Sequence, residues 1–112
     1  MVHGGFGLAS LFGELLDQLA VQRRVIAVEL QAHGHTHEID RAFSYEGFGD
    51  DLAGVIEHLG LGRADLLGYS PGACASLPTA IQHPERVRRL ALVSIPFRRE
   101  AGSPRSWRRC RS

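Results

Sequence analysis

Apolar residues recur at three- and four-residue spacing in two stretches of the chain, which is the pattern of an amphipathic helix. The apolar stripes are Leu11, Phe12, Leu15, Leu16 and Leu19 in the first stretch and Phe48, Leu52, Val55, Ile56 and Leu59 in the second. The first stretch predicts a helix near residues 9–20, for which Ser10 is a candidate N-cap. The second predicts a helix near 45–59, which Ser44 would cap and which Gly60 would end in a left-handed turn.

Three short runs are apolar almost throughout, as are strands that are buried on both faces. They predict strands near 24–30, 64–69 and 87–94. A further helix is predicted over 72–82, where the interior Pro78 should cost about 3 kcal/mol or kink the helix. Helices and strands therefore alternate along the chain. This order is typical of an α/β fold with a parallel sheet and right-handed crossovers.

Length, charge and cysteine usage indicate how many domains the protein has, which partners it excludes and where it is located. Its 112 residues suffice for one domain, and a net charge of +1 argues against a nucleic acid or a membrane surface as partner. We expect a domain over residues 1–97 and a disordered, arginine-rich tail over 98–112. Cys74 and Cys110 form no disulfide framework, and the sequence shows no signal peptide, so we expect a cytoplasmic protein of undetermined oligomeric state.

One pentapeptide carries candidate chemistry. The sequence Gly68-Tyr69-Ser70-Pro71-Gly72 follows a predicted strand and opens a predicted helix. This is the setting of a nucleophile elbow, in which a serine sits on a sharp strand-to-helix turn. Flanking glycines suit such a turn because a Cβ would clash there, and the helix N-terminus favours negative charge on an attacked substrate. By itself the pattern is short enough to be a glycine-rich turn without function.

Three further segments extend the pattern over most of the chain. Residues 3–7 read HGGFG, residues 29–35 read ELQAHGH, and residues 83–93 join HPERV to an apolar strand. Together with the pentapeptide, in this order and at this spacing, they resemble the α/β-hydrolase family over residues 2–97. In that family the first segment supplies an oxyanion-hole amide and the second is the loop after the fourth strand.

The resemblance implies a truncated α/β-hydrolase, a three-layer αβα sandwich with a mainly parallel sheet of about three strands. It implies that Ser70 is the catalytic nucleophile and that the backbone amides of Gly5 and Phe6 are oxyanion-hole donors. It implies no cofactor and no metal. The substrate would be a small molecule with an ester, thioester, lactone or carbon–carbon bond to cleave, because serine at position 70 points away from the dehalogenase and epoxide-hydrolase branches.

The catalytic partners of Ser70 are missing from this pattern. The family's carboxylate and histidine follow later strands, whereas His83 and Glu85 are expected at the end of the sheet opposite the elbow. Pro71 also lacks the N–H that the residue after the nucleophile donates to the oxyanion. We therefore assign no catalytic base and expect little activity.

The family's third strand is reduced to residues 1–2, which leaves the predicted strand at 24–30 without its neighbour. With the missing catalytic partners, this keeps an inert hydrolase remnant and a small binding module open as alternatives.

A metal-dependent hydrolase is a further alternative. His33, His35 and His37 alternate, Glu38 and Asp40 follow them, and imidazole is a common zinc ligand. The polarity of this segment indicates a loop, and the hydrolase pattern already accounts for it, so the metal interpretation is disfavoured.

Overall fold

The structure, a computed structural model, describes residues 1–5 and 7–96. Along the chain it contains the 3-10 helix η1 (Ala9–Phe12), α1 (Glu14–Ala20), α2 (Tyr45–His58), β1 (Ala64–Tyr69), α3 (Pro71–Gln82), the 3-10 helix η2 (Pro84–Arg86) and β2 (Val87–Val93). No helix in this part of the chain has the length and the hydropathy needed to cross a bilayer. The expected disordered tail at 98–112 lies outside the described residues.

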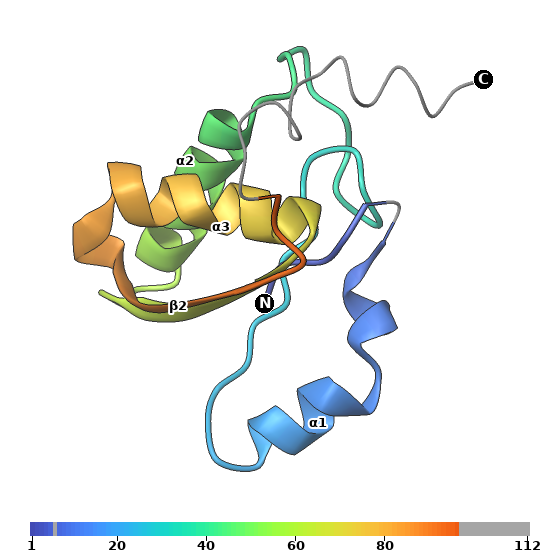
Figure 1. The fold of residues 1–112 in the computed structure, drawn as a ribbon, viewed down its shortest axis with the longest axis vertical. Coiled ribbons are helices and arrows are strands. Elements are labelled where there is room, and N and C mark those ends of the chain that lie inside the picture. Colours follow the sequence, from blue (N-terminus) through green and yellow to red (C-terminus); the bar gives the residue numbers. More distant parts are fainter. Residues whose placement is uncertain (6, 97–112) are drawn as a thin grey trace.

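The centre of the fold is a parallel pair of strands, β1 and β2, joined by α3. Their register places Leu66 opposite Leu90 and Tyr69 opposite Val93. α3 packs against both strands and α2 packs against α3, so these two helices lie on the same side of the sheet (Figure 1). The order of the elements and the parallel pairing confirm the predicted α/β class.

Two clusters of buried apolar side chains hold these elements together. In the first, Ile56 of α2 packs with Leu66 of β1 and Val87 of β2. The second cluster consists of Val2, Leu30, Phe48, Leu52 and Ala75. It joins the N-terminus and the end of the 24–30 segment to α2 and α3. Val2 and Leu30, from the first third of the chain, are therefore joined to α2 and α3 through a shared core.

The sheet is smaller than the sequence predicts, because residues 24–30 do not form a strand. Within this segment Val28 makes one isolated parallel bridge to Val2, which bridges to Gly68 on its other side. A strand needs an extended neighbour for its backbone hydrogen bonds, and Met1 and Val2 supply only two residues of one. The prediction of about three strands was wrong. α2 and α3 cover one face of this sheet, whereas Figure 1 shows α1 on the other side of the strands.

The predicted helix over 9–20 is divided at Gly13 into η1 and α1. Gly13 has φ 51° and ψ −135°, a conformation that ends the first helix before the second begins. Ser10 is not an N-cap, because Leu8 occupies that position without a side-chain hydrogen bond. The apolar stripe lies largely in solvent, with Leu11 72% exposed, and Figure 1 shows α1 well away from α2 and α3.

The start and stop signals of α2 act as predicted. The Oγ of Ser44 accepts a hydrogen bond from the Gly47 amide at 3.0 Å, and Gly60 has a φ of 64° just beyond the helix. α3 runs through Pro78 rather than ending there. The local sequence therefore determines the two helices that carry the core.

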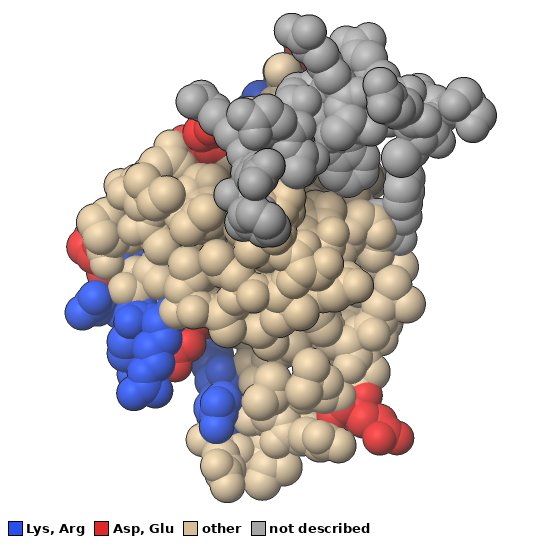
Figure 2. Space-filling view, in the orientation of Figure 1, with Lys and Arg blue, Asp and Glu red and all other residues tan. Residues whose placement is uncertain are grey.

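Charged side chains lie mostly at the border of the face seen in Figure 2, where basic residues gather beneath the end at which both strands begin. At the start of the strands, Arg88 donates two hydrogen bonds to the Asp65 carboxylate, at 2.9 and 2.8 Å. Nearby, Arg86 forms an ion pair with Glu57 at 3.2 Å. These pairs link β2 to β1 and η2 to α2.

Replacing Leu52 with alanine tests the core described above. Leu52 is 2% exposed, so Leu52→Ala should lower the free energy of unfolding by about 2–5 kcal/mol through lost burial and a residual cavity. The matched control is Leu11→Ala, which should change it by less than about 0.5 kcal/mol because Leu11 is already in solvent. Urea denaturation followed by circular dichroism measures both. Equal losses would contradict the described core.

Candidate active site

Ser70 lies where β1 ends and α3 begins. Its backbone has φ 52° and ψ −115°, a conformation that costs a non-glycine residue free energy and is found at sites that require it. The Ser70 amide donates to the carbonyl of Val93 at 2.8 Å, and its carbonyl accepts from the amide of Cys74 at 3.0 Å. Both strands and the first turn of α3 therefore hold this residue in the sharp turn expected from the sequence.

The two flanking glycines are required by space. A Cβ on Gly68 would lie 2.6 Å from the backbone nitrogen of Ala73, in the first turn of α3. A Cβ on Gly72 would lie 2.6 Å from the carbonyl oxygen of His3. Real Cβ atoms do not approach backbone atoms so closely. Gly68 thus allows α3 to fold back against β1, and Gly72 allows the N-terminal segment to pass the elbow.

The N-terminal segment runs directly beside this turn. Val2 donates from its amide to Leu67 O at 2.9 Å and accepts from the Tyr69 amide at 3.1 Å. Gly4 follows so closely that a Cβ there would lie 2.8 Å from the Tyr69 ring. The chain then reaches the exposed Gly5. Phe6, the second predicted oxyanion donor, lies outside the described residues, so the donor roles of both stay predictions.

His3 fixes the position of that segment. Its Nδ1 lies 2.7 Å from the carbonyl oxygen of Gly4, and its Nε2 lies 3.0 Å from the amide of Leu30. A carbonyl can only accept and an amide can only donate, so the ring is the neutral tautomer with its proton on Nδ1. The side chain is 2% exposed. His3 is therefore a structural link from the N-terminal segment to residue 30.

The histidine that follows Ser70 in the sequence lies far from it. His83 is the C-cap of the twelve-residue α3, whose length of about 18 Å separates it from the elbow. Its Nε2 contacts the Asp50 carboxylate at 2.7 Å, and its Nδ1 faces Glu85 at 3.9 Å. Within residues 1–5 and 7–96, no histidine or carboxylate is hydrogen-bonded to the Ser70 hydroxyl. Pro71 occupies the first helical position, where its ring nitrogen has no proton to donate.

Glu29 organises the loop that follows the 24–30 segment. Its carboxylate accepts hydrogen bonds from the His35 amide at 2.6 Å, from the Ala9 amide at 3.0 Å and from the His35 ring at 3.0 Å. These donors, the two backbone amides first, lower the pKa of Glu29 from 4.5 to about 2. The Thr36 hydroxyl donates to the Glu29 carbonyl at 2.8 Å and closes the loop.

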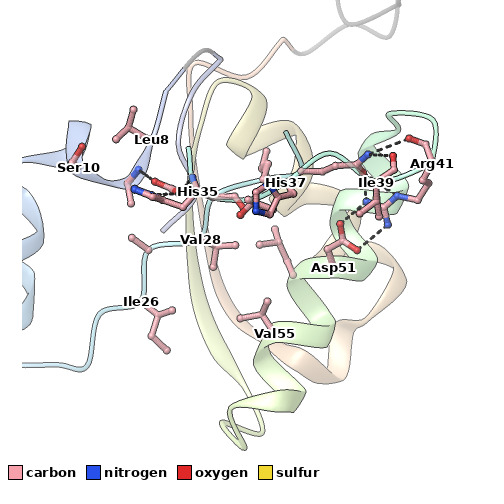
Figure 3. A pocket seen from close by; sticks show the side chains of 17 residues that line it. Leu8, Ser10, Ile26, Val28, His35, His37, Ile39, Arg41, Asp51 and Val55 are labelled. Atoms are coloured by element: carbon pink, nitrogen blue, oxygen red, sulfur yellow. Dashed lines mark hydrogen bonds and ion pairs between the residues drawn. The ribbon is translucent and has the colours of Figure 1, made fainter. Parts of the chain in front are cut away.

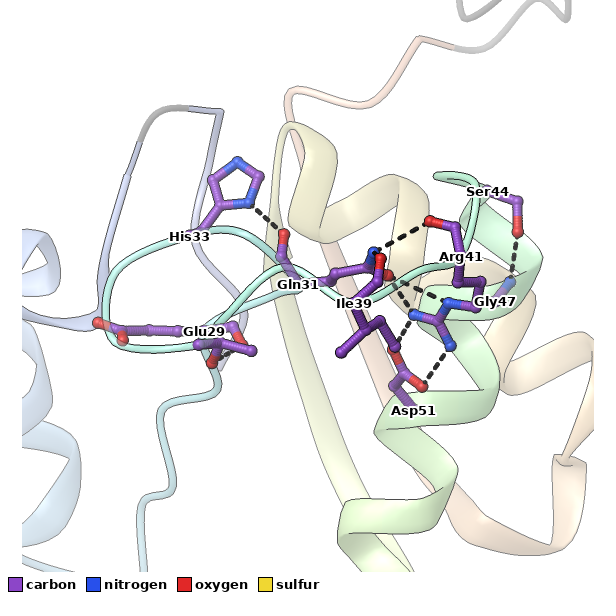
Figure 4. Close-up of polar contacts among 9 residues, drawn as sticks. Glu29, Gln31, His33, Ile39, Arg41, Ser44, Gly47 and Asp51 are labelled. Atoms are coloured by element: carbon purple, nitrogen blue, oxygen red, sulfur yellow. Dashed lines mark hydrogen bonds and ion pairs between the residues drawn. The ribbon is translucent and has the colours of Figure 1, made fainter.

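The other end of this loop is tied to α2 (Figure 4). Arg41 donates two hydrogen bonds to the Asp51 carboxylate, at 2.9 and 2.6 Å, and two more to the Gln31 side-chain oxygen. The side-chain nitrogen of Gln31 donates to the backbone carbonyls of Ile39 and Arg41. Gln31 is only 4% exposed, so its polar atoms depend on these partners.

The alternating histidines do not converge. His33 contacts the carbonyl of Gln31 through Nδ1 at 2.9 Å and packs its ring near His3, whereas His35 turns to Glu29. Among the described residues, no three histidine, cysteine or acidic side chains are grouped so that they could hold a metal ion. The geometry therefore gives the metal-dependent alternative no support.

A cavity of about 770 Å³ opens between the 26–31 segment, α2 and the start of η1 (Figure 3). Its wall is mostly apolar, with Leu8, Ile26, Val28, Leu52 and Val55 among the lining residues. Glu29, His35, Arg41 and Asp51 are among the charged and polar residues of the lining. Ser70 and its neighbours do not line it, so the cavity and the elbow are separate features of the described chain.

Sequence reasoning missed the Glu29–His35 pair and the cavity beside it. The two residues are six positions apart, within the segment for which the sequence predicts a loop. An acidic residue placed directly after an apolar run, with a glycine and a histidine following, is the signal from which the contact could have been proposed. The cavity had no such signal, because its lining comes from segments that are distant in the sequence.

Comparison with known proteins gives consistent results. A family model described as "alpha/beta hydrolase fold" matches residues 1–111. The chain is 37% identical over 97 residues to 2-hydroxymuconate semialdehyde hydrolase from Pseudomonas sp. (strain CF600). This alignment covers 83% of this chain and 34% of that protein. It is 35% identical over 96 residues to the sn-1-specific diacylglycerol lipase ABHD11 of Mus musculus. This alignment covers 84% of this chain and 31% of the lipase. The chain thus spans about a third of the length of these relatives.

A solved structure has the same fold. It is described as "Est816 as an N-Acyl homoserine lactone degrading enzyme" and superposes with a TM-score of 0.80 at 22% sequence identity. The match covers 90% of this chain and 41% of that one.

Alanine should have opposite effects on stability at a crowded glycine, Gly72, and at an open one, Gly54. Gly72→Ala should destabilise the protein and detach the N-terminal segment, because its Cβ would collide with the carbonyls of Val2 and His3. Gly54→Ala, on an open face of α2 with nothing within 4 Å, should raise the free energy of unfolding by about 0.5–1 kcal/mol. Urea denaturation measures both variants. A neutral Gly72→Ala would show that the segment does not pass the elbow as described.

Acidification should disorder the loop held by Glu29. Because the folded pKa of Glu29 lies below its usual 4.5, its hydrogen bonds stabilise the loop fully above about pH 4.5 and are lost as the pH falls toward 2. The amide resonance of His35, followed by NMR, should shift with a midpoint near pH 2. In Glu29→Gln this transition should disappear. A midpoint near 4.5 in the unchanged protein would mean that the carboxylate lacks these donors.

Proposed function

Because the chain belongs to the α/β-hydrolase fold family, we propose that Ser70 is a nucleophile for hydrolysis of an ester or a related acyl bond. The observation that carries this proposal is the backbone of Ser70, with φ 52° and ψ −115° between a strand and a helix. A strained conformation at the mouth of a strand–helix turn is the geometry on which a nucleophilic serine depends. A merely structural turn would be more stable with glycine at this position.

The electrostatics of the elbow support the same role. α3 directs its positive end at Ser70, which favours an oxyanion formed there. We propose that the amides of Gly5 and Phe6 are the donors to that oxyanion, since the segment passes Tyr69 just before them. Pro71 withdraws one donor from the elbow, and this loss is worth about 10² to 10³ in rate where a comparable donor has been removed.

The names of the relatives support a proposal for the substrate class. One relative is named as a hydrolase of a semialdehyde, another as a diacylglycerol lipase, and the solved neighbour as an enzyme that degrades an acyl lactone. For this chain we propose a small-molecule acyl substrate, with neither a nucleic acid nor a membrane as partner, and a cytoplasmic location. No cofactor is needed for this chemistry.

The proposed chemistry is incomplete within these residues. A serine hydroxyl is a poor nucleophile until a neighbouring base removes its proton, and His83 is engaged with Asp50 at the far end of α3. Members of a catalytic triad act as a unit, so the loss of one removes most of the rate. We therefore propose that this chain alone turns over ester substrates only at a trace level.

Labelling and turnover of Ser70 test the proposal. The purified chain should hydrolyse an activated aryl ester no more than about 10³-fold faster than water does, without a burst. A fluorophosphonate should label Ser70 slowly, and Ser70→Ala should abolish that label. Robust labelling with turnover lost in Ser70→Ala would show that a base acts on Ser70 after all. Equal labelling of both proteins would contradict the nucleophile assignment and favour the inert alternative.

The variant Pro71→Leu separates the effect of the missing backbone N–H from that of the missing base. It restores a backbone N–H after the serine without supplying a base. Turnover should therefore stay at a trace level in Pro71→Leu. A rise of about 10² or more would show that the missing amide, rather than the missing base, limits the rate.

A further inference from the structure

His35 is paired with a carboxylate through one ring nitrogen only. Its Nδ1 lies 3.0 Å from Glu29 Oε2, and an ionised carboxylate only accepts, so Nδ1 carries the proton of that hydrogen bond. The neutral ring then has its lone pair on Nε2. Among the described residues, none forms a hydrogen bond or an ion pair with Nε2, and the side chain is 89% exposed. The ring is thus oriented by an acid and open to a reactant.

Glu29 is held firmly enough to orient that ring. Its side chain is 9% exposed and accepts from the amides of Ala9 and His35 as well as from the imidazole. Because these donors keep the pKa of Glu29 at about 2, the group is a carboxylate at neutral pH. A fixed anion at Nδ1 stabilises positive charge on the ring when Nε2 forms a bond.

The pair also borders a place where a molecule could be held. Glu29 and His35 both line the cavity of about 770 Å³, and Leu8, Ile26 and Val28 line it with apolar surface (Figure 3). An apolar cavity with a few polar groups at one side is the usual form of a small-molecule site. The cavity does not include Ser70, so its chemistry does not depend on the elbow.

We propose that the Glu29–His35 pair is a second reactive site, at which imidazole attacks activated esters of small apolar acids bound in the cavity. The Nε2 lone pair forms a bond to the carbonyl carbon, and the bond from that carbon to the leaving oxygen breaks, which releases the alcohol as its anion. Water then attacks the acyl carbon, the bond from that carbon to Nε2 breaks, and two protons pass to solvent, one of which can neutralise the alcohol anion. The carboxylate product leaves, and His35 returns to its neutral form.

His83 is the natural comparison within the same chain. It also contacts a carboxylate, but through Nε2 to Asp50, while its Nδ1 faces Glu85. Neither ring nitrogen is left both free and oriented, and His83 does not line the cavity. A rate that came from any surface imidazole would be shared by His83, whereas the proposed site predicts that His35 dominates.

The test measures p-nitrophenyl acetate hydrolysis in the Ser70→Ala protein, which removes any contribution of the elbow. Adding His35→Gln should lower the residual rate about tenfold, whereas adding His83→Gln should leave it unchanged. Circular dichroism of each variant confirms folding, which His35→Gln should preserve because the ring is in solvent. Equal rates in the His35 and His83 variants would overturn the proposal.

Two further readouts distinguish chemistry from structure. Rapid quenching and peptide mapping should find the acetyl group on His35, and an adduct on another residue would overturn the assignment. Glu29→Gln, which tests a positioning residue, should lower kcat with little change in KM. Failure of this site leaves the Ser70 proposal intact, because fluorophosphonate labelling of Ser70 does not depend on His35.

Discussion

The backbone of Met1 and Val2 joins the two parts of this molecule. Val2 is fully buried, donates to Leu67 O and accepts from the Tyr69 amide, while Met1 O accepts from the Val28 amide. Val2 therefore lies between the 24–30 segment and β1, and these two do not pair with each other directly. The position of residues 3–5 beside the elbow, and that of the cavity beside the core, both depend on these two residues.

Burial of the Met1 amino group at the start of this connection has an electrostatic cost. The Met1 amino group donates to Ile26 O at 2.7 Å in a partly buried position, and this burial lowers its pKa. A charged amine in such a place gains one good hydrogen bond but loses much of its hydration. The Nε2 of His3 extends the connection by accepting from the Leu30 amide. Side-chain and terminal groups thus provide contacts that a longer strand would provide with its peptide groups.

The parts of the fold that sequence predicted are those determined by neighbouring residues. Ser44 and Gly60 define α2 by local hydrogen bonding and backbone freedom, and Gly68 with Gly72 permits the turn at Ser70. The predictions failed where an element needs a distant partner. An apolar run such as 24–30 becomes a strand only beside another extended segment, and the stripe of the 9–20 helix is buried only if a surface lies opposite. Neither condition can be recognised in the run itself.

Apolar side chains exposed in η1 and directly after α1 also affect how the protein behaves in solution. With Leu11 72% and Val21 81% exposed, this end of the molecule presents apolar surface that nothing in the described chain covers. Exposed apolar surface favours self-association as protein concentration rises. We therefore expect that the η1–α1 region, which is remote from Ser70, limits the concentration at which the isolated chain stays monomeric.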